Sequence, residues 1–239
     1  MGDNVPFDAP LFSSDEGVTL VGGGPAAPHD LHEALALAPR IVAADGGAVA
    51  ALDAGFVPEA VYGDMDSLSA EDRVRIPAGR IHAIPEQMTT DFDKALRHVR
   101  APFVVAVGFT GARVDHELSV YHGLIARAEA RCIVLGAQDI VLHAPPEIAL
   151  DLPEGTRVSL FPLARVTGRS EGLDWPLDGH AFHPATRIGT SNRASGGRVR
   201  IALDGAGMLL ILPRAHLAGA ARALQAASLW SRASKDAWV

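Results

Sequence analysis

The sequence predicts an α/β domain, built on a parallel sheet with helices on both faces, followed by an antiparallel β-sandwich. Up to about residue 144, short continuous apolar runs alternate with segments that place apolar residues at helical spacing. Continuous apolar strands that alternate with helices are typical of a parallel sheet covered on both faces. After Pro145-Pro146, the apolar runs are separated by turns rich in Gly, Pro and Asp, which favours antiparallel strands.

The individual elements follow from these patterns. In the first part, helical spacing is clear at Phe92, Leu96 and Val99, and the expected strands are 18–21, 40–44, 60–62, 80–84, 103–107, 131–135 and 140–142. In the second part, the expected strands are 147–152, 157–161, 198–203 and 208–212. We therefore expect a Rossmann-like domain over 15–145, a β-sandwich over 146–214, and a helical extension over 215–239 with Leu217, Ala221 and Leu224 on one face.

Composition and charge argue against several classes of protein. The 239 residues carry a formal net charge of −7 and have a sequence pI of about 5.8, which argues against a general nucleic-acid binder. Apolar runs of membrane-spanning length are absent, and the first residues lack the basic start and apolar core of a signal peptide. The single cysteine, Cys132, cannot form a disulfide within the chain. We therefore expect a cytoplasmic protein that binds neither nucleic acid nor membrane.

The stretch Gly63-Asp64-Met65-Asp66-Ser67 follows the strand expected at 60–62. In extended backbone the side chains repeat every second residue, so Asp64 and Asp66 would point the same way. Two neighbouring like charges repel each other, and the pair is favourable mainly when a cation lies between them. Magnesium takes such carboxylate ligands and leaves its other positions to water and phosphate. An isolated Asp-x-Asp favours a solvated loop, so only the rest of the chain can support the metal interpretation.

Polar residues and glycines follow the other expected strands of this domain as well. In a parallel sheet with helices on both faces, ligands bind at the carboxyl ends of the strands. Glycines, carboxylates and one arginine gather at this single edge, in the stretches 22–24, 45–47, 64–66, 87–91 and 108–116. This concentration predicts a ligand site at the carboxyl edge of the sheet.

A competing pattern follows the first expected strand. Gly22-x-Gly24-x-x-Ala27 fits the dinucleotide-binding fingerprint, and Asp45 stands where a ribose-binding acid would lie. Pro25 and Pro28 disturb this loop, so the helix is expected to begin near His29 and the pyrophosphate would lose its amide donors. A nicotinamide-dependent enzyme stays an alternative, whereas the sequence contains no P-loop.

Several of the polar residues also have purely structural interpretations. Thr90 suits the N-cap of a helix and Asp91 its first turn, where a carboxylate compensates the helix dipole, and Lys94 could be a helix-surface charge. Asp115 could cap the next helix, and a lone His116 is compatible with a hydrogen-bonded structural side chain. These residues gain a functional interpretation only as a group.

The second domain contains one aromatic candidate for ligand binding. Trp175 either fills a core or stacks on a flat heterocycle, with Ser191 and Asn192 supplying hydrogen bonds. The residues alone leave both interpretations open.

Taken together, these stretches resemble the thiamine pyrophosphokinase family. The matching pieces occur in family order and cover nearly the whole chain: 44–48, 63–67, 90–91 with 94–96, 111–116, 172–175 and 190–192. The resemblance implies a homodimer whose active sites lie between the catalytic α/β domain of one subunit and the sandwich of the other. It also implies transfer of the terminal pyrophosphate of ATP onto the hydroxyethyl group of thiamine, which gives thiamine diphosphate and AMP.

The resemblance further implies roles for individual residues. Asp64, Asp66 and Asp91 would hold Mg2+ at the phosphate oxygens with Asp45 nearby, and one of these catalytic aspartates is expected to be the general base. ATP binding would involve Gln87, Thr90, Lys94, Gly111, Arg113, Asp115 and His116. Thiamine would stack on Trp175, with Ser191 and Asn192 fixing its edge.

Some positions depart from the family pattern. Ala112 stands where a glycine is usual, Ser119 and Val120 occupy the region of a usual asparagine, and 86–89 is an imperfect version of its counterpart. The tail from Ala215 also extends past the usual end. Two further alternatives therefore stay open: a pyrophosphokinase for another hydroxymethyl heterocycle such as a pterin, and a non-catalytic relative that binds nucleotide or thiamine without forming AMP.

Overall fold

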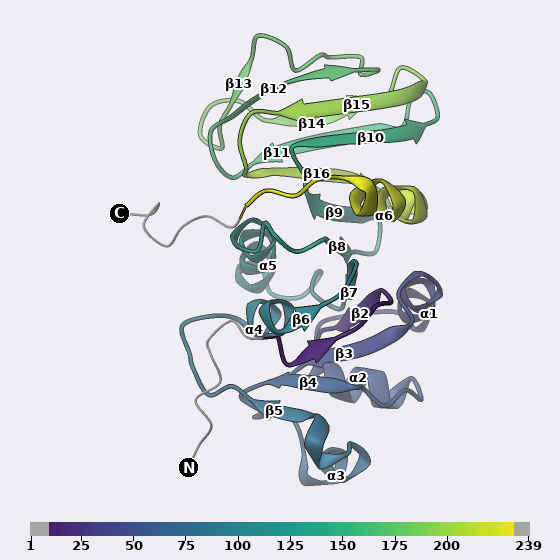
Figure 1. The fold of residues 1–239 in the computed structure, drawn as a ribbon, viewed down its shortest axis with the longest axis vertical. Helices are drawn as coiled ribbons and strands as arrows, with labels where there is room; N and C mark the ends of the chain where they lie inside the picture. The colour runs from purple at the N-terminus through teal and green to yellow at the C-terminus, as the bar shows by residue number, and fades with distance from the viewer. Residues whose placement is uncertain (1–9, 232–239) are drawn as a thin grey trace. The chain divides into compact units, whose positions relative to one another are not determined.

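The computed structural model describes residues 10–231 of the chain (Figure 1). The chain divides after Val120 into two compact units, which we call the N-terminal unit and the C-terminal unit. The first is built on a parallel sheet and the second on antiparallel sheets.

The N-terminal unit contains a parallel sheet with the strand order β7-β2-β3-β4-β5. Its strands are β2 (Val18–Val21), β3 (Arg40–Ala44), β4 (Ala60–Gly63), β5 (Ile81–Ala83) and β7 (Val104–Val107). All residues of β2, β4 and β7 are buried, which explains why these strands read as continuous apolar runs. Two short strands, β1 (Phe12–Ser13) and β6 (Val99–Arg100), form a separate parallel pair.

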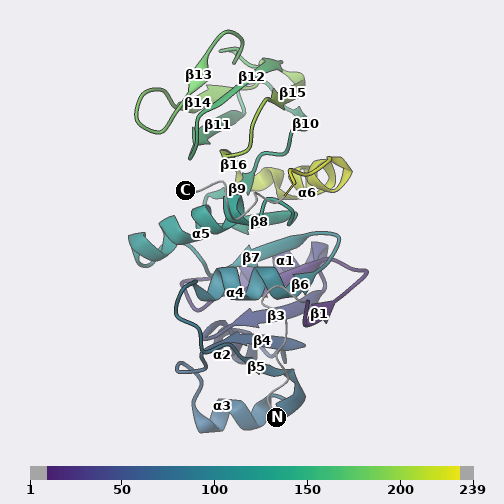
Figure 2. The ribbon, with the colours of Figure 1, turned by 60° about the vertical axis from the view of Figure 1, so that its left-hand side comes forward.

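Helices cover both faces of this sheet. The helical segments are α1 (Pro28–Leu37), α2 (Gly47–Asp53), α3 (Ala70–Arg75), η1 (Ala78–Arg80) and α4 (Asp91–His98), and α5 (Val114–Ala126) begins in this unit. Figure 2 shows α4 on the opposite side of the sheet from α1 and α2. Right-handed crossovers produce this arrangement, because the chain adds strands in one direction as far as β5 and then returns to place β7 beside β2.

The return of the chain creates a switch point in the strand order. The strand β2 pairs with β3 on one side and with β7 on the other, so the loops after β2 and β7 leave the sheet toward opposite faces. A crevice opens at such a point, outside the carboxyl ends of the strands. The ligand site predicted from the sequence lies at this same edge of the sheet.

The C-terminal unit contains two antiparallel sheets, with the strand orders β14-β11-β16-β9-β8 and β10-β15-β12-β13. The strands are β8 (Cys132–Leu135), β9 (Asp139–His143), β10 (Glu147–Leu152), β11 (Arg157–Pro162), β12 (Val166–Glu171), β13 (Ala181–Phe182), β14 (Gly189–Arg193), β15 (Gly197–Leu203) and β16 (Met208–Pro213). Alternate residues are buried along β10 and β15, where Ile148 pairs with Ile201 and Leu150 with Val199. The predicted fold class, a parallel α/β sheet followed by antiparallel sheets, is confirmed.

The structure differs from the sequence prediction in several details. Val99 was expected on the helix with Phe92 and Leu96, but α4 ends at His98 and Val99 lies in β6, which pairs with β1; neither strand was predicted. The runs at 131–135 and 140–142 were expected within the parallel part, but β8 and β9 pair antiparallel because the connection between them is too short for a crossover. The strands β12 and β14 were missed because Thr, Gly, Ser and Arg fill them rather than an apolar run. The short β13 was also missed. The domain limits at 145 and 214 stay predictions.

A helical segment follows β16, as expected. It consists of η2 (Arg214–His216) and α6 (Leu217–Ala226), and the predicted inner face of Leu217, Ala221 and Leu224 is buried. Arg131 donates hydrogen bonds to the carbonyls of Leu224 (3.1 Å) and Ala227 (3.0 Å), which satisfies free acceptors at the end of α6. Positions 232–239 of the expected extension lie outside the described residues. Among the helices of the described part, none is long and apolar enough to cross a membrane.

The imidazole of His143 is a buried titratable group in the C-terminal unit. Its Nε2 accepts a hydrogen bond from the Gly207 N–H at 3.0 Å, so the neutral ring is the form that fits. Burial lowers the pKa of His143 from 6.5 to about 4. Protonation therefore favours the unfolded chain, and this contribution to stability is complete above about pH 6.5 and is lost as the pH falls toward 4.

We expect the substitution His143→Gln to reduce the loss of stability on acidification. Glutamine can still accept the Gly207 hydrogen bond but does not titrate, so about 2 kcal/mol of the loss between pH 7 and pH 5 should disappear. Urea unfolding at several pH values measures this difference. The exposed His180→Gln is the matched control, and equal pH slopes for the unsubstituted protein and His143→Gln would contradict the assignment.

Candidate active site

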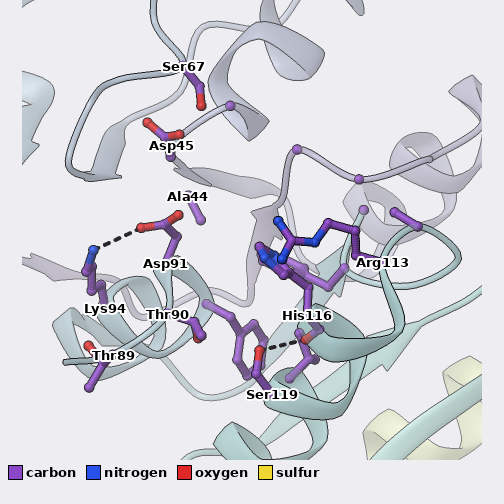
Figure 3. A pocket seen from close by; sticks show the side chains of 18 of the residues that line it. Ala44, Asp45, Ser67, Thr89, Thr90, Asp91, Lys94, Arg113, His116 and Ser119 are labelled. Carbon is purple, nitrogen blue, oxygen red and sulfur yellow. Dashed lines mark hydrogen bonds and ion pairs between the residues drawn. The ribbon is translucent and has the colours of Figure 1, made fainter. Parts of the chain in front are cut away.

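The loops at the carboxyl edge of the parallel sheet surround a cavity of about 570 Å³ in the N-terminal unit (Figure 3). Gly23 and Gly24 follow β2, Asp45 and Gly46 follow β3, and Asp64 follows β4. The beginnings of α4 and α5 complete the wall, with Thr90, Asp91, Lys94, Arg113, His116 and Ser119. The cavity thus lies where the switch point in the strand order predicts a ligand crevice.

Three carboxylates form one cluster at this edge. One oxygen each from Asp45, Asp64 and Asp66 can be chosen so that all three atoms lie within 4.8 Å of one another. Asp45 is only 6% exposed, and its Oδ1 is buried without a hydrogen-bond partner among the described residues. A buried charged oxygen in this condition is costly unless a cation binds it. The cluster therefore fits a hard divalent cation such as Mg2+.

The backbone brings Asp45 to this position by a close approach of two strand ends. The Asp45 N–H donates to the Tyr62 carbonyl at 2.7 Å, and Asp45 itself has φ of +40°. A Cβ on Gly63 would lie 2.8 Å from the Asp45 Cβ, so only glycine permits this contact without a shift. Asp45 was predicted as a catalytic residue near the metal, and the structure places it inside the carboxylate cluster.

Asp64 is held in its ionised form by its neighbours. Hydrogen bonds from the Gln87 side-chain amide (3.1 Å) and the Asp66 N–H (3.3 Å) hold the pKa of the Asp64 carboxyl below its usual value. Asp66 is exposed and accepts a hydrogen bond from the Ser67 hydroxyl at 3.1 Å. Gln87 was predicted as an ATP-binding residue, and in the structure it orients a carboxylate of the cluster.

Asp91 lies in the cavity wall but outside the three-carboxylate cluster. The Asp91 Oδ1 accepts a hydrogen bond from the Lys94 ammonium at 3.2 Å. Figure 3 shows this ion pair as a dashed line. Burial raises the pKa of the Asp91 carboxyl, while the hydrogen bond from Lys94 acts in the opposite direction. The side chain of Lys94 is only 2% exposed, so its charge is aimed at the cavity rather than at bulk solvent. The metal-ligand role predicted for Asp91 stays a prediction.

Of the predicted ATP-binding residues near the start of α5, Arg113 and His116 line the cavity and lie across from Asp91 in Figure 3, whereas Gly111 and Asp115 are not among the residues that line it. Arg113 forms hydrogen bonds with both carboxylate oxygens of Asp115, at 2.6 and 3.2 Å, and both side chains are exposed. This pairing raises the pKa of Arg113 and lowers that of Asp115. His116 lines the cavity, and its carbonyl accepts from the Ser119 hydroxyl at 2.6 Å.

The loop before α5 contains the residue that departs from the family pattern. Gly111 has φ of +80°, which glycine adopts easily, and its N–H donates to Glu117 at 3.0 Å. Ala112 lines the cavity and is not among the residues with positive φ in the described chain. The methyl group of Ala112 therefore causes no backbone strain at this position.

Sequence reasoning missed a buried network beneath the wall of the cavity. The side chain of Arg97 is 1% exposed and forms ion pairs with Glu86 at 2.9 Å and Asp93 at 3.7 Å. Glu86 also accepts from the N–H groups of Met88 (2.7 Å) and Thr89 (3.1 Å), so it closes the loop that presents Gln87. The charged residues at 86, 93 and 97 were the available signal, but only the fold brings them together. The Thr90 side chain caps α4 by accepting from the Asp93 N–H, as expected.

The glycines after β2 form the floor of the cavity. A Cβ on Gly24 would lie 2.7 Å from the Gly108 carbonyl oxygen, so the loops after β2 and β7 touch through their backbones. The helix α1 begins only at Pro28, as the prolines predicted, and its N-terminus therefore does not directly follow the glycine-rich turn. The dinucleotide interpretation thus lacks its anion-binding helix start.

The aromatic candidate lies in the C-terminal unit. Trp175 is 55% exposed, and the Arg193 guanidinium lies 5.2 Å from its ring centroid. The Asn192 amide is buried and hydrogen-bonds the backbone of Trp175: it accepts from the Trp175 N–H (3.2 Å) and donates to the Trp175 carbonyl (2.7 Å). Asn192 therefore positions Trp175, and its direct contact with a ligand stays a prediction. Ser191 is exposed, has φ of +62°, and donates its N–H to Ser159 at 3.0 Å.

Together, the fold and the cavity define a doubly wound α/β protein whose crevice suits a metal-bound phosphate group. The model of the thiamin pyrophosphokinase catalytic domain matches residues 31–135, and that of the vitamin B1 binding domain of the same enzymes matches residues 141–206. The chain belongs to the thiamin pyrophosphokinase family.

Individual relatives agree with this assignment. A thiamine pyrophosphokinase from Bacillus subtilis (strain 168) is 30% identical over 135 residues, which is 52% of this chain and 62% of the relative. The aligned part thus spans less than two thirds of that relative. A crystal structure of thiamine pyrophosphokinase from Bacillus subtilis has a TM-score of 0.66 at 22% identity, over 83% of this chain and 98% of that one. A structure of thiamin pyrophosphokinase from Candida albicans has a TM-score of 0.70 at 15% identity, over 87% of this chain and 94% of that one.

We expect Asp45→Asn to stabilise the metal-free protein and to remove its stabilisation by Mg2+. The neutral amide ends the repulsion from Asp64 and Asp66, and asparagine tolerates the positive φ of position 45. Thermal unfolding should show a metal-free Tm higher by about 2 to 4 °C, the shift that ~1 kcal/mol produces in a chain of this size. The unsubstituted protein should gain stability with Mg2+, as should the control Asp53→Asn. An unchanged Mg2+ effect in Asp45→Asn would contradict the cluster as the cation site.

Proposed function

We propose that the chain is a thiamine pyrophosphokinase, which transfers the terminal pyrophosphate of ATP to the hydroxyethyl oxygen of thiamine and releases AMP. The observation that carries the proposal is the cluster of Asp45, Asp64 and Asp66 at the carboxyl edge of the sheet, in a chain that matches both domains of the family. The β-phosphorus is attacked, the bond to the α-phosphate oxygen breaks, and the hydroxyl proton passes to a base.

The triphosphate would be bound both through Mg2+ at the acidic cluster and directly by cationic side chains of the cavity wall. Asp45, Asp64 and Asp66 would hold Mg2+, which neutralises phosphate charge during the transfer. Lys94 and Arg113 are the cationic side chains of the cavity wall, and each can bind a phosphate oxygen directly. The attacking hydroxyl also needs a proton acceptor. Because burial raises the pKa of Asp91, this carboxylate is a stronger base than Asp64.

Thiamine binding is assigned to Trp175. Asn192 bonds both the N–H and the carbonyl of Trp175 and so fixes the backbone that carries the half-exposed ring. The ring can therefore serve as a stacking surface for a flat heterocycle. Ser191 lies on the neighbouring strand β14 with its side chain exposed, where a hydroxyl can bond the edge of the ring.

We further propose that the protein is a cytoplasmic homodimer. In this assembly the cavity of one subunit would be completed by the Trp175 region of its partner. The exposure of apolar side chains in both regions supports the proposal, since Val114 and Leu118 near the cavity are as open to solvent as Trp175. The only cysteine, Cys132, is buried and free, which suits a reducing compartment.

The proposed reaction predicts AMP formation from ATP and Mg2+ that depends on thiamine. Asp66→Asn should lower the rate by at least about a hundredfold, because it removes a carboxylate that would hold the Mg2+ needed to neutralise the transferred phosphate. Asp53→Asn, an exposed charge on α2, should leave the rate unchanged. Chromatographic separation of AMP from ATP measures the reaction.

Two results would contradict this proposal in different ways. Full activity in both Asp64→Asn and Asp66→Asn would overturn the metal assignment. ATP binding without thiamine-dependent AMP would leave a pterin-like alcohol as acceptor, or a non-catalytic relative, and Ala112→Gly would then test whether the family glycine restores turnover.

The shared site predicts complementation between two inactive variants. Asp64→Asn damages the metal cluster and Trp175→Ala damages the thiamine surface, so each homodimer should be inactive. When the two are unfolded together and refolded, each mixed dimer contains one site with neither change, and activity should return. Sedimentation should confirm the dimer for each variant. Without recovery in refolded mixed dimers, the active site would have to be formed by a single subunit.

A further inference from the structure

The residue between two cluster carboxylates has an unusual backbone conformation. Met65 has φ of +67°, in the left-handed region, although its side chain is bulky. This side chain is 3% exposed and packs in a cluster with Val61, Leu68 and Ile76. The inward turn of Met65 leaves Asp64 and Asp66 on the outer side of the loop, where their oxygens meet the buried Asp45.

A left-handed conformation at a non-glycine residue is strained and persists only when its surroundings enforce it. Burial of the Met65 side chain is one such constraint. The other is Arg73, whose guanidinium donates from Nη2 to the Met65 carbonyl at 2.5 Å and from Nε to the Leu68 carbonyl at 3.2 Å. One rigid planar group thus fixes both ends of the turn that contains Asp66.

Arg73 is itself held in place by the short helix α3. The Ser69 hydroxyl caps this helix by accepting from the Asp72 N–H at 3.1 Å, and it donates to the Asp72 carboxylate at 2.6 Å. The loop, the cap and the helix therefore form one hydrogen-bonded unit whose outer side bears the two carboxylates. Groups that orient metal ligands in this way raise metal affinity without touching the metal.

We propose that Arg73 is a positioning residue for the divalent cation: by holding the Met65 and Leu68 carbonyls, it keeps Asp64 and Asp66 directed at one ion. This inference rests on the proposed metal binding by the cluster. It assigns Arg73 a role that its exposed position on α3 and its lack of contact with the cavity do not suggest.

The same helix offers a matched control. Arg75 also donates to a backbone carbonyl, that of Leu52 at 3.1 Å, and forms ion pairs with Asp72 at 3.3 Å and Asp53 at 3.8 Å. None of these contacts involves the loop of Asp64 and Asp66. Replacing Arg75 therefore removes a comparable side chain and comparable structural contacts without releasing the carboxylates.

The test compares Mn2+ binding to Arg73→Met, Arg75→Met and the unsubstituted protein by isothermal titration calorimetry, together with the Tm of each metal-free protein. Arg73→Met should bind Mn2+ about tenfold more weakly, as expected for the loss of a group that orients metal ligands. Arg75→Met should show the affinity of the unsubstituted protein even where its Tm falls. Arg73→Lys keeps a donor for one carbonyl but not for both, and its affinity should lie between these values.

The outcomes separate the inference from the proposed function. If the unsubstituted protein binds Mn2+ and Arg73→Met binds it equally well, the inference is wrong while the metal site stands. If the unsubstituted protein does not bind Mn2+, the proposed metal site and the role of Arg73 are both wrong. Should Arg73→Met not fold, Arg73→Lys decides alone, and an affinity equal to that of the unsubstituted protein would overturn the inference.

Discussion

Electrostatic repulsion among Asp45, Asp64 and Asp66 is the constraint that the structure around the cavity of the N-terminal unit has to overcome. Three like charges whose oxygens can lie within 4.8 Å of one another oppose folding, and the oxygen of Asp45 that finds no protein donor adds to this cost. The surrounding structure holds the cluster in place, through the close approach of Gly63 to Asp45. The cluster therefore stores unfavourable energy that a bound cation can release, which is a common property of functional sites.

The neighbours of the cluster act mainly through the backbone. Arg73 donates to carbonyls on one side of the loop that carries Asp64 and Asp66, and Glu86 accepts from N–H groups on the other side, where Gln87 reaches Asp64. The C-terminal unit uses the same device, since the Asn192 amide bonds both backbone groups of Trp175. In each case a side chain fixes the backbone that carries a proposed ligand-binding group, and such fixing lowers the entropy lost when a ligand binds.

Much of the site was predictable because it follows directly from strand periodicity and topology. Each polar stretch came after an apolar run, and parallel strands bring their carboxyl ends to one edge. Asp64 and Asp66 could therefore be paired from their spacing alone. The place of Asp45 inside the carboxylate cluster could not be predicted, because its approach to Asp64 depends on a positive φ and on a glycine contact between β3 and β4. The network of Arg97 left only charges at scattered positions in the sequence, and the contacts of Arg73 with the Met65 and Leu68 carbonyls left no pattern.

The sequence by itself determined the α/β class, most strands and the family, since these depend on local periodicity and on short motifs in a fixed order. Tertiary structure alone decided that β8 and β9 pair antiparallel and that polar segments such as β12 and β14 become strands. It also decided which carboxylates share one cluster. The physical reason is that pairing partners, close backbone contacts and the repulsion between distant charges depend on residues far apart in the chain, which no local pattern records.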